Sequence, residues 1–295
     1  MMITVLLSCL LTLACGAPRA ELTTETTQNR DFTERDEFTR TYQLGPGTDV
    51  EVSSIRGHVT ITNADGATAE VKIIRTARTR EDLEYHKIDV QQSGNSLVVR
   101  GIQEPDERRG RNVQVDHQVI LKLPRSIDLK VNSISGRLKA DDVDGEANVN
   151  SVSGSVIIGN VSGKLQVRSV SGNLVLGNVG GEARVMSISG NVRLGQVSGL
   201  IDVASVSGGL DATIVSLTPQ GIQIKSVSGS IELAFKSDVN ADFRAESISG
   251  GVHIDIPNVT RDIVAKSSDV RARIGAGGTP ISIFSVSGSI RLTRS

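Results

Sequence analysis

The chain has 295 residues and a formal net charge of -1, so it offers no overall electrostatic attraction to nucleic acid, and we expect no nucleic-acid partner. Aromatic residues make up 2% of the sequence and tryptophan is absent. Any core must therefore be built from aliphatic side chains in narrow spaces, which excludes a bulky mixed core.

The start of the chain is typical of an export signal. Residues 1–13 form an uncharged apolar run that is too short to span a bilayer, and small residues follow it. Residues 11–16, LTLACG, resemble the lipobox of bacterial lipoproteins, in which a cysteine is lipidated and becomes the mature N-terminus. The resemblance implies a signal segment over residues 1–15 and lipid on Cys15. Because Thr12 stands where that family usually has leucine, an ordinary cleaved signal peptide is the alternative.

The lipobox resemblance also implies a location. Gly16, rather than aspartate, follows the cysteine, which resembles outer-membrane sorting in Gram-negative lipoproteins. We therefore expect an exported lipoprotein of the bacterial outer membrane that faces the periplasm or the surface. Its partner would be the membrane, through the lipid anchor.

Residues 16–42 mix threonine, glutamate, arginine and asparagine with almost no aliphatic periodicity, which predicts a flexible tether. The two cysteines, Cys9 and Cys15, both lie in the leader. The exported body therefore has no disulfide, and its stability must come from packing.

From residue 43 to residue 132 the sequence alternates between apolar and polar residues in short runs, which predicts an irregular β region that caps the structure. Thr79 and Asp82 resemble a helix N-cap pair, so we expect one short helix between strands here. The segment SIRGHVTITNADG, at residues 54–66, is an isolated early copy of the repeat that follows. The N-terminal region is therefore predicted to be a degenerate start of the same structure.

A strict nine-residue glycine period begins at Gly136 and ends at Gly208, which indicates stacked copies of one unit. The residue two positions before each glycine is valine or isoleucine, and we expect all of these side chains to point inward. They are Ile134, Val143, Val152, Val161, Val170, Val179, Ile188, Val197 and Val206. On this assignment, aspartate at Val170 should destabilise the protein far more than aspartate at Ser171.

Breaks in the alternation predict an all-β fold, a parallel β-solenoid of about 18 residues per coil in which strands pair between coils. One corner falls at the pairs Gly159 and Asn160, Gly177 and Asn178, and Gly195 and Gln196. Their glycines would supply unusual backbone angles, and the amides would stack as a ladder. The other corner falls at Arg168 and Ser169, where Ser151, Ser169, Ser187 and Ser205 would form a hydroxyl column. The recurrent inward glycine either bends the arm or lets the walls approach closely.

The repeat spacing lengthens after Gly208, and the last copies are SVSG at 226–229, SISG at 247–250 and SVSG at 285–288. We expect coils stacked in chain order over residues 133–295, with Ser267 and Ser268 marking a degenerate copy. The last strand, SIRLTRS, would then lie at the free end. Its Arg291 and Arg294 would oppose edge-to-edge addition, which predicts a monomer.

The segment VILKLPRSIDLKVNSISGRL, followed by repeated SVSG and NVSG units, resembles the bacterial putative adhesin family of β-solenoid domains of unknown function. The resemblance covers residues 43–295. Leu123 and Pro124 match the family's Leu-Pro element before the coils. It implies an exported, envelope-facing protein and no catalytic residues.

A search for chemistry in the sequence predicts no catalytic residues, no metal and no cofactor. The acidic cluster of Asp141, Asp142, Asp144 and Glu146 could hold calcium weakly, but a solvated corner is the favoured interpretation. The four histidines are scattered without metal-ligand spacing, and neither HExxH nor GxSxG occurs. A polysaccharide-acting β-helix enzyme, which needs paired carboxylates and aromatic platforms, is a weak alternative.

Two non-enzymatic functions remain. In the first, the solenoid presents a repetitive surface that binds a glycan or an envelope protein. The candidate binding residues are Ser135, Ser153, Ser171, Ser189 and Ser207. In the second, the protein is a passive stalk or scaffold, and these serines only keep the strand soluble.

Overall fold

The computed structural model describes residues 33–103, 115–261 and 269–294. Cys15, with the rest of the leader, and the pair Ser267 and Ser268 lie outside these residues, so the predictions made for them stay predictions. The sequence predicts a tether as far as residue 42, whereas a strand begins at Glu34. Phe38 and Tyr42 of this strand pack against the core, which explains why it is ordered.

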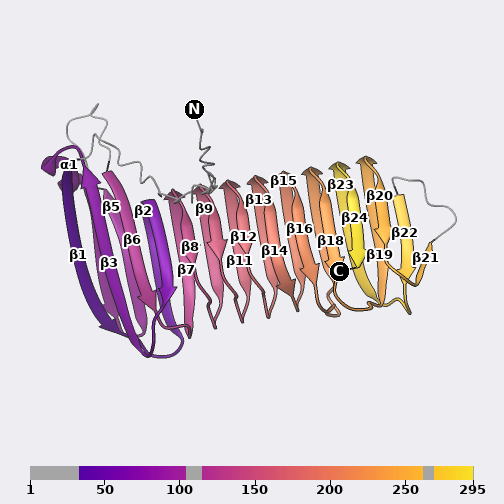
Figure 1. Ribbon diagram of the computed structural model, residues 1–295, viewed down its shortest axis with the longest axis horizontal. Helices are drawn as coiled ribbons and strands as arrows, with labels where there is room; N and C mark the ends of the chain where they lie inside the picture. The colour runs from indigo at the N-terminus through magenta and orange to yellow at the C-terminus, as the bar shows by residue number, and fades with distance from the viewer. Residues whose placement is uncertain (1–32, 104–114, 262–268, 295) are drawn as a thin grey trace, which may run out of the picture. The chain divides into compact units, whose positions relative to one another are not determined.

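Figure 1 shows strands packed side by side along the described chain, with one short helix, α1 (Arg80–Tyr85). The strands are β1 (Glu34–Gln43), β2 (Thr48–Asn63), β3 (Thr68–Ala77), β4 (His86–Ser93), β5 (Ser96–Gln103), β6 (Val115–Leu123), β7 (Ile127–Ser135), β8 (Leu138–Ala140), β9 (Ala147–Ser153), β10 (Val156–Ile158), β11 (Leu165–Ser171), β12 (Leu174–Leu176), β13 (Ala183–Ser189), β14 (Val192–Val197), β15 (Ile201–Ser207), β16 (Leu210–Ile214), β17 (Ile222–Ser228), β18 (Ile231–Phe235), β19 (Ala241–Ser249), β20 (Val252–Asp255), β21 (Val259–Arg261), β22 (Asp269–Ile274), β23 (Thr279–Ser287) and β24 (Ile290–Arg294).

The strands form two walls around one aliphatic core, and β2 contributes to both. Sheet A has the order β1-β3-β6-β2-β8-β10-β12-β14-β16-β18-β24-β20. Sheet B has the order β4-β5-β2-β7-β9-β11-β13-β15-β17-β23-β19-β22-β21. In sheet A the neighbouring strands from β2 to β18 are parallel, and in sheet B those from β2 to β17 are parallel. The predicted parallel β-solenoid is therefore confirmed.

The regular coils pair in a register of eighteen residues. Val156 lies opposite Leu174 in sheet A, and Leu165 lies opposite Ala183 in sheet B. A third contact line is formed by isolated bridges between Val143, Val161, Val179 and Val197. Each side chain therefore stacks on the equivalent side chain of the next coil, and backbone groups are paired between coils.

The predicted inward valine positions are correct in only half of the coil. Val143, Val161, Val179 and Val197 are buried. The alternate positions point outward, and their exposed fractions lie between 38% and 52%. These outward residues are Ile134, Val152, Val170, Ile188 and Val206. Beside each of them the buried residue is serine, as at Ser169, which is 4% exposed.

The reason for this difference is strand phase. In β11 the inward positions Leu165, Val167 and Ser169 alternate without a break, so Arg168 and Ser169 lie within a strand rather than at a corner. The chain bends three residues after Ser169, at Gly172, which has a φ of +127°. The hydroxyl column of Ser151, Ser169, Ser187 and Ser205 exists, but it lies inside the solenoid.

The corrected assignment reverses the expected effect of aspartate at Val170. We expect Ser169→Asp to lower the free energy of unfolding by about 3 kcal/mol or more, because it buries an unpaired charge. Val170→Asp should change it by less than about 1 kcal/mol, because residue 170 faces solvent. Chemical denaturation of the two variants checks this, and comparable losses would contradict the assignment.

Two kinds of glycine stack between coils. Gly136, Gly154 and Gly172 have positive φ and bend the strand, and each also lies against the backbone of the preceding copy. The glycine therefore bends the arm, and the close approach at this position is to the neighbouring coil rather than between the two walls. Gly159 and Gly177 do not have positive φ, so the unusual angles expected at that corner are absent there. They are glycine because a methyl group would overlap the preceding coil's backbone.

The close stacking predicts a sharp contrast between two glycines. Alanine at Gly172 would be strained at positive φ and would overlap the carbonyl group of Gly154. We expect Gly172→Ala to cost about 2–5 kcal/mol of stability. Gly209 is the matched control, because a methyl group there meets nothing closer than 3.5 Å. Gly209→Ala should remain within about 1 kcal/mol of the parent protein, and equal thermal unfolding of both variants would refute the close packing.

The last coils are not stacked in chain order. β17 and β18 pair with β23 and β24, and β19 and β20 lie beyond those later strands. The C-terminal strand β24 is therefore internal, which makes its predicted role as a free edge wrong. Beyond β19 in sheet B come the antiparallel strands β22 and β21. The SVSG copies are alike, so any of them can pair with any other, and the connecting segments decide the order.

At the other end, β2 places residues 54–63 on the first coil, with Val59 opposite Leu138, so the early repeat copy belongs to the stack. Antiparallel strands β1, β3, β4 and the parallel strands β5 and β6 complete this end. The predicted short helix is present as α1, and the Thr79 hydroxyl accepts a hydrogen bond from the backbone N–H of Asp82 at 3.2 Å.

Candidate functional site

A groove of about 720 Å³ runs along the outer face of sheet B. Its first wall is the aliphatic stripe, which consists of Ile134, Val152, Val170, Ile188, Val206 and Val227. Its second wall is the mixed column, which consists of Asn132, Asn150, Arg168, Met186, Ala204, Lys225 and Phe284. The buried serines between the two walls form its floor. The volume is in the range of pockets that hold small molecules.

The groove lies where the inward residue is serine and the strand is about to bend at glycine. Ser169 is smaller than the aliphatic Val167 that precedes it on the inner face, so the wall can approach the core at that point. Arg168 and Val170 flank Ser169 on the outer face and line the hollow. Every coil repeats this local structure, so the hollow continues from strand to strand.

The aliphatic stripe is an unusual feature of the described surface. Val152 is 52% exposed and Ile188 is 51% exposed, although both are large apolar residues. The stripe continues beyond the groove on the same face to Ile248, which is 67% exposed. Single exposed aliphatic residues need no explanation, whereas a contiguous row across many strands does.

The charges at the groove have one sign. Arg168 and Lys225 line it, and no carboxylate is among the described residues of the lining. Neither cation has an ion-pair partner within the described part of the chain. They lie in the same column, with Met186 and Ala204 on the strands between them.

The two ends of the mixed column differ in polarity. Asn132 and Asn150 precede Arg168, and the Asn150 amide donates a hydrogen bond to Asn132 Oδ1 at 2.8 Å. Phe284 follows Lys225 at the other end. The next residue beyond Phe284 is Glu246, which carries a negative charge just outside the groove. One end of the column is therefore polar, with two asparagines before Arg168, whereas the other end combines the cation of Lys225 with the apolar ring of Phe284.

The predicted binding serines lie beside the groove rather than in it. Ser153, Ser171, Ser189 and Ser207 are exposed and stack in register on neighbouring strands, and Ser135 joins them at partial exposure. They follow the aliphatic stripe residue by residue along the chain. They therefore form a hydroxyl border along one side of the groove.

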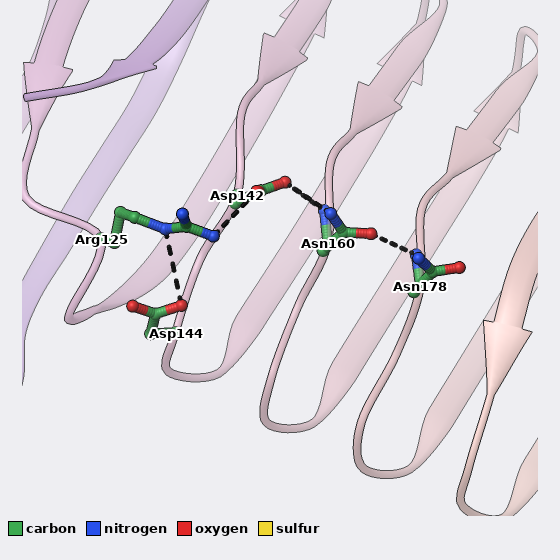
Figure 2. A network of polar contacts seen from close by, with 5 residues as sticks. All are labelled: Arg125, Asp142, Asp144, Asn160 and Asn178. Atoms are coloured by element: carbon green, nitrogen blue, oxygen red, sulfur yellow. Dashed lines mark hydrogen bonds and ion pairs between the residues drawn. The ribbon is translucent and has the colours of Figure 1, made fainter.

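A second polar feature, shown in Figure 2, lies at the corner after the short strands of sheet A. The Asp142 carboxylate accepts hydrogen bonds from the backbone N–H and the amide of Asn160, at 2.8 and 3.0 Å. Asn160 Oδ1 in turn accepts from the backbone N–H of Asn178 at 3.1 Å, and Asn178 Oδ1 accepts from Gln196 at 2.9 Å. The side chains thus hold the corner backbones together, coil to coil.

The acidic cluster is engaged at this same corner. Arg125 Nη2 lies 2.8 Å from Asp142 Oδ2, and Arg125 Nε lies 3.7 Å from Asp144 Oδ1 (Figure 2). The single positive charge of Arg125 offsets one of the two carboxylate charges that it contacts. No group of three metal-binding side chains is found among the described residues.

Two histidines that are distant in sequence come together near α1. The rings of His86 and His117 lie 6.1 Å apart, and His117 Nδ1 is 2.9 Å from the carbonyl oxygen of Arg56. Burial lowers the pKa of both imidazoles, and for His86 the neighbouring His117 lowers the pKa further. The pair is packed in the N-terminal end of the structure, away from the groove.

The groove residues were missed by sequence reasoning, because the stripe was assigned to the core and Arg168 to a corner. The available signal was the unbroken alternation of Leu165, Val167 and Ser169, which places Arg168 and Val170 on the outside. Within the described ranges, no helix is long and apolar enough to cross a membrane.

An open stack of coils with an outward groove defines a β-solenoid repeat protein. The family model that matches it is Toastrack DUF4097, over residues 48–293. The chain therefore belongs to the Toastrack DUF4097 family, and the resemblance to the adhesin-like solenoid domains is confirmed. No curated protein matches the chain.

Solved structures with similar architecture come from several bacteria. A putative adhesin from Bacteroides fragilis is 14% identical, with a TM-score of 0.43, and the match covers 87% of this chain and 97% of that one. A protein from Parabacteroides distasonis called a putative lipid binding protein is 11% identical, with a TM-score of 0.33 and coverages of 87% and 96%. A putative cell adhesion protein from Clostridium sporogenes is 11% identical, with a TM-score of 0.29 and coverages of 89% and 100%.

Proposed function

We propose that the protein is a non-enzymatic, adhesin-like protein of the cell envelope, and that the groove on sheet B is its binding surface. The observation that carries the proposal is a contrast between the two outer faces of the same coils. The stripe is aliphatic on six successive strands of sheet B. The outward position in the middle of the sheet A strands is mixed. It is occupied by Lys139, Ile157, Val175, Arg193 and Asp211.

Strand propensity does not explain this contrast, because both faces need residues that favour extended structure. A contiguous exposed apolar row is typical of an interaction site, and its repetition suits an elongated partner laid across the strands. An envelope component, such as a glycan-bearing or lipid-bearing molecule or an envelope protein, is the partner class, and the protein acts as a monomer.

The test compares two exposed positions on opposite faces. Ile188→Glu places a charge in the groove, and Val175→Glu places the same charge on the outer face of sheet A, where Val175 is 40% exposed. We expect the purified protein to bind isolated envelope fractions or an arrayed glycan, and Ile188→Glu to weaken binding about tenfold or more. Val175→Glu should bind like the parent. No binding would assign the passive-stalk function instead, and equal binding by all three proteins would overturn the groove as the binding surface.

We also propose that the protein is exported and anchored in the outer membrane by lipid on Cys15. The support is the apolar leader and the lipobox-like LTLACG run. Metabolic labelling with a fatty-acid analogue should mark the wild type and not Cys15→Ala. Equal labelling of both would overturn the anchor and leave an ordinary signal peptide.

A further inference from the structure

The groove has the polarity of a site for one anionic lipid molecule. We propose that it holds a single acyl chain whose anionic headgroup lies at Arg168. This inference rests on the proposed function, because it names the ligand of the same groove.

The headgroup position follows from the charges. Arg168 is a cation without an ion-pair partner in the described chain, and its guanidinium is suited to paired hydrogen bonds with a carboxylate or phosphate. Asn150 lies beside it on the neighbouring strand and adds a polar amide. At the opposite end, Phe284 is apolar, and Glu246 beyond it is an acidic residue whose carboxylate lies 4.0 Å from Arg244 Nη2. The charged end of the ligand therefore belongs at Arg168.

The tail position follows from the apolar walls. From Arg168 toward Phe284 the mixed column continues with Met186 and Ala204, opposite Ile188, Val206 and Val227 of the stripe. Four strand steps separate Arg168 from Phe284, which is about 19 Å at the usual strand spacing. An acyl chain spans one leaflet of a bilayer, about 15 Å, so it fits this length. Lys225 can extend its stem over the tail and keep its ammonium in water.

Other occupants fit the groove less well. A second copy placed face to face, with its columns aligned about a twofold axis that runs across the strands, would set Arg168 against Arg168 and Lys225 against Lys225. An added β-strand needs free backbone groups, and the backbone of these strands is already paired within sheet B. A flat bilayer surface does not enter a concave groove.

The test uses cis-parinaric acid, a fatty acid whose polyene tail becomes fluorescent in an apolar site, at a pH where its carboxylate is ionised. We expect saturable binding to the whole protein. Val206→Glu, in the tail region, should weaken it about tenfold or more, whereas the matched exposed control Val175→Glu should stay within about twofold. Unchanged affinity in Val206→Glu, or no binding by the wild type, would overturn the proposal.

The position of the headgroup at Arg168 is tested separately, with two variants and an uncharged ligand. Arg168→Gln should weaken binding of the acid about tenfold and leave binding of its methyl ester unchanged, because only the acid is charged. Lys225→Gln should change binding of the acid by less than about threefold. A larger loss in Lys225→Gln than in Arg168→Gln would overturn the orientation, and equal affinity for acid and ester would overturn the anionic headgroup.

Two further results separate this inference from the proposed function. Sedimentation with vesicles of phosphatidylcholine and phosphatidylglycerol, without parinaric acid binding, would show recognition of a membrane surface and overturn the single-lipid site. Envelope or glycan binding that depends on Ile188 but is not accompanied by lipid binding would also overturn it, while the groove would keep its proposed function.

Discussion

Pairing of each strand with the equivalent strand of the neighbouring coil is the constraint on which the rest of the structure depends. The register of eighteen residues places each side chain about 4.8 Å from the side chain at the equivalent position of the next coil. A position can therefore hold only a residue that tolerates its own neighbours. Aliphatic residues do so by packing, glycine by its small size, and asparagine by bonding from one coil to the next, as Asn160 does with Asn178. Some charges pair across coils, as Lys164 does with Glu182 at 3.2 Å.

The solenoid architecture could be predicted from the sequence because this constraint requires similar residues at equivalent positions, which appears in the sequence as a regular repeat. The inner face could be predicted only in part. Ser169 is polar and Val170 is apolar, so hydrophobicity alone predicts Val170 in the core and Ser169 on the surface, the reverse of what the structure shows. Strand phase, set by Leu165 and Val167, overrides that preference, because a strand cannot turn one side chain without turning all of them. The candidate site follows from this single correction, since it moves a whole stripe from the core to the surface.

The order of the last coils lay beyond sequence reasoning for a different reason. The repeat copies in β17, β19 and β23 all end in SVS or SIS, so this motif does not distinguish their neighbours. β23 lies between β17 and β19 because the intervening chain crosses to β19 and β20, forms the antiparallel pair of β21 and β22, and returns. Such a choice depends on connecting segments and on long-range closure, which leave no periodic signal in the sequence.

The ends and the face of the stack differ in how they meet solvent, and this difference bears on function. The first and last strands of a stack expose unpaired backbone groups, to which another copy of the protein could add. The edge strands of sheet A carry charged side chains, as in β1 with its sequence ERDEFTRTYQ and β20 with VHID. Charged side chains on an edge strand oppose such addition. The aliphatic stripe carries no comparable protection, although a contiguous apolar row is also prone to association. Charge therefore protects the edges, where association would polymerise the protein, while the groove stays apolar. This arrangement favours binding of a partner at the groove.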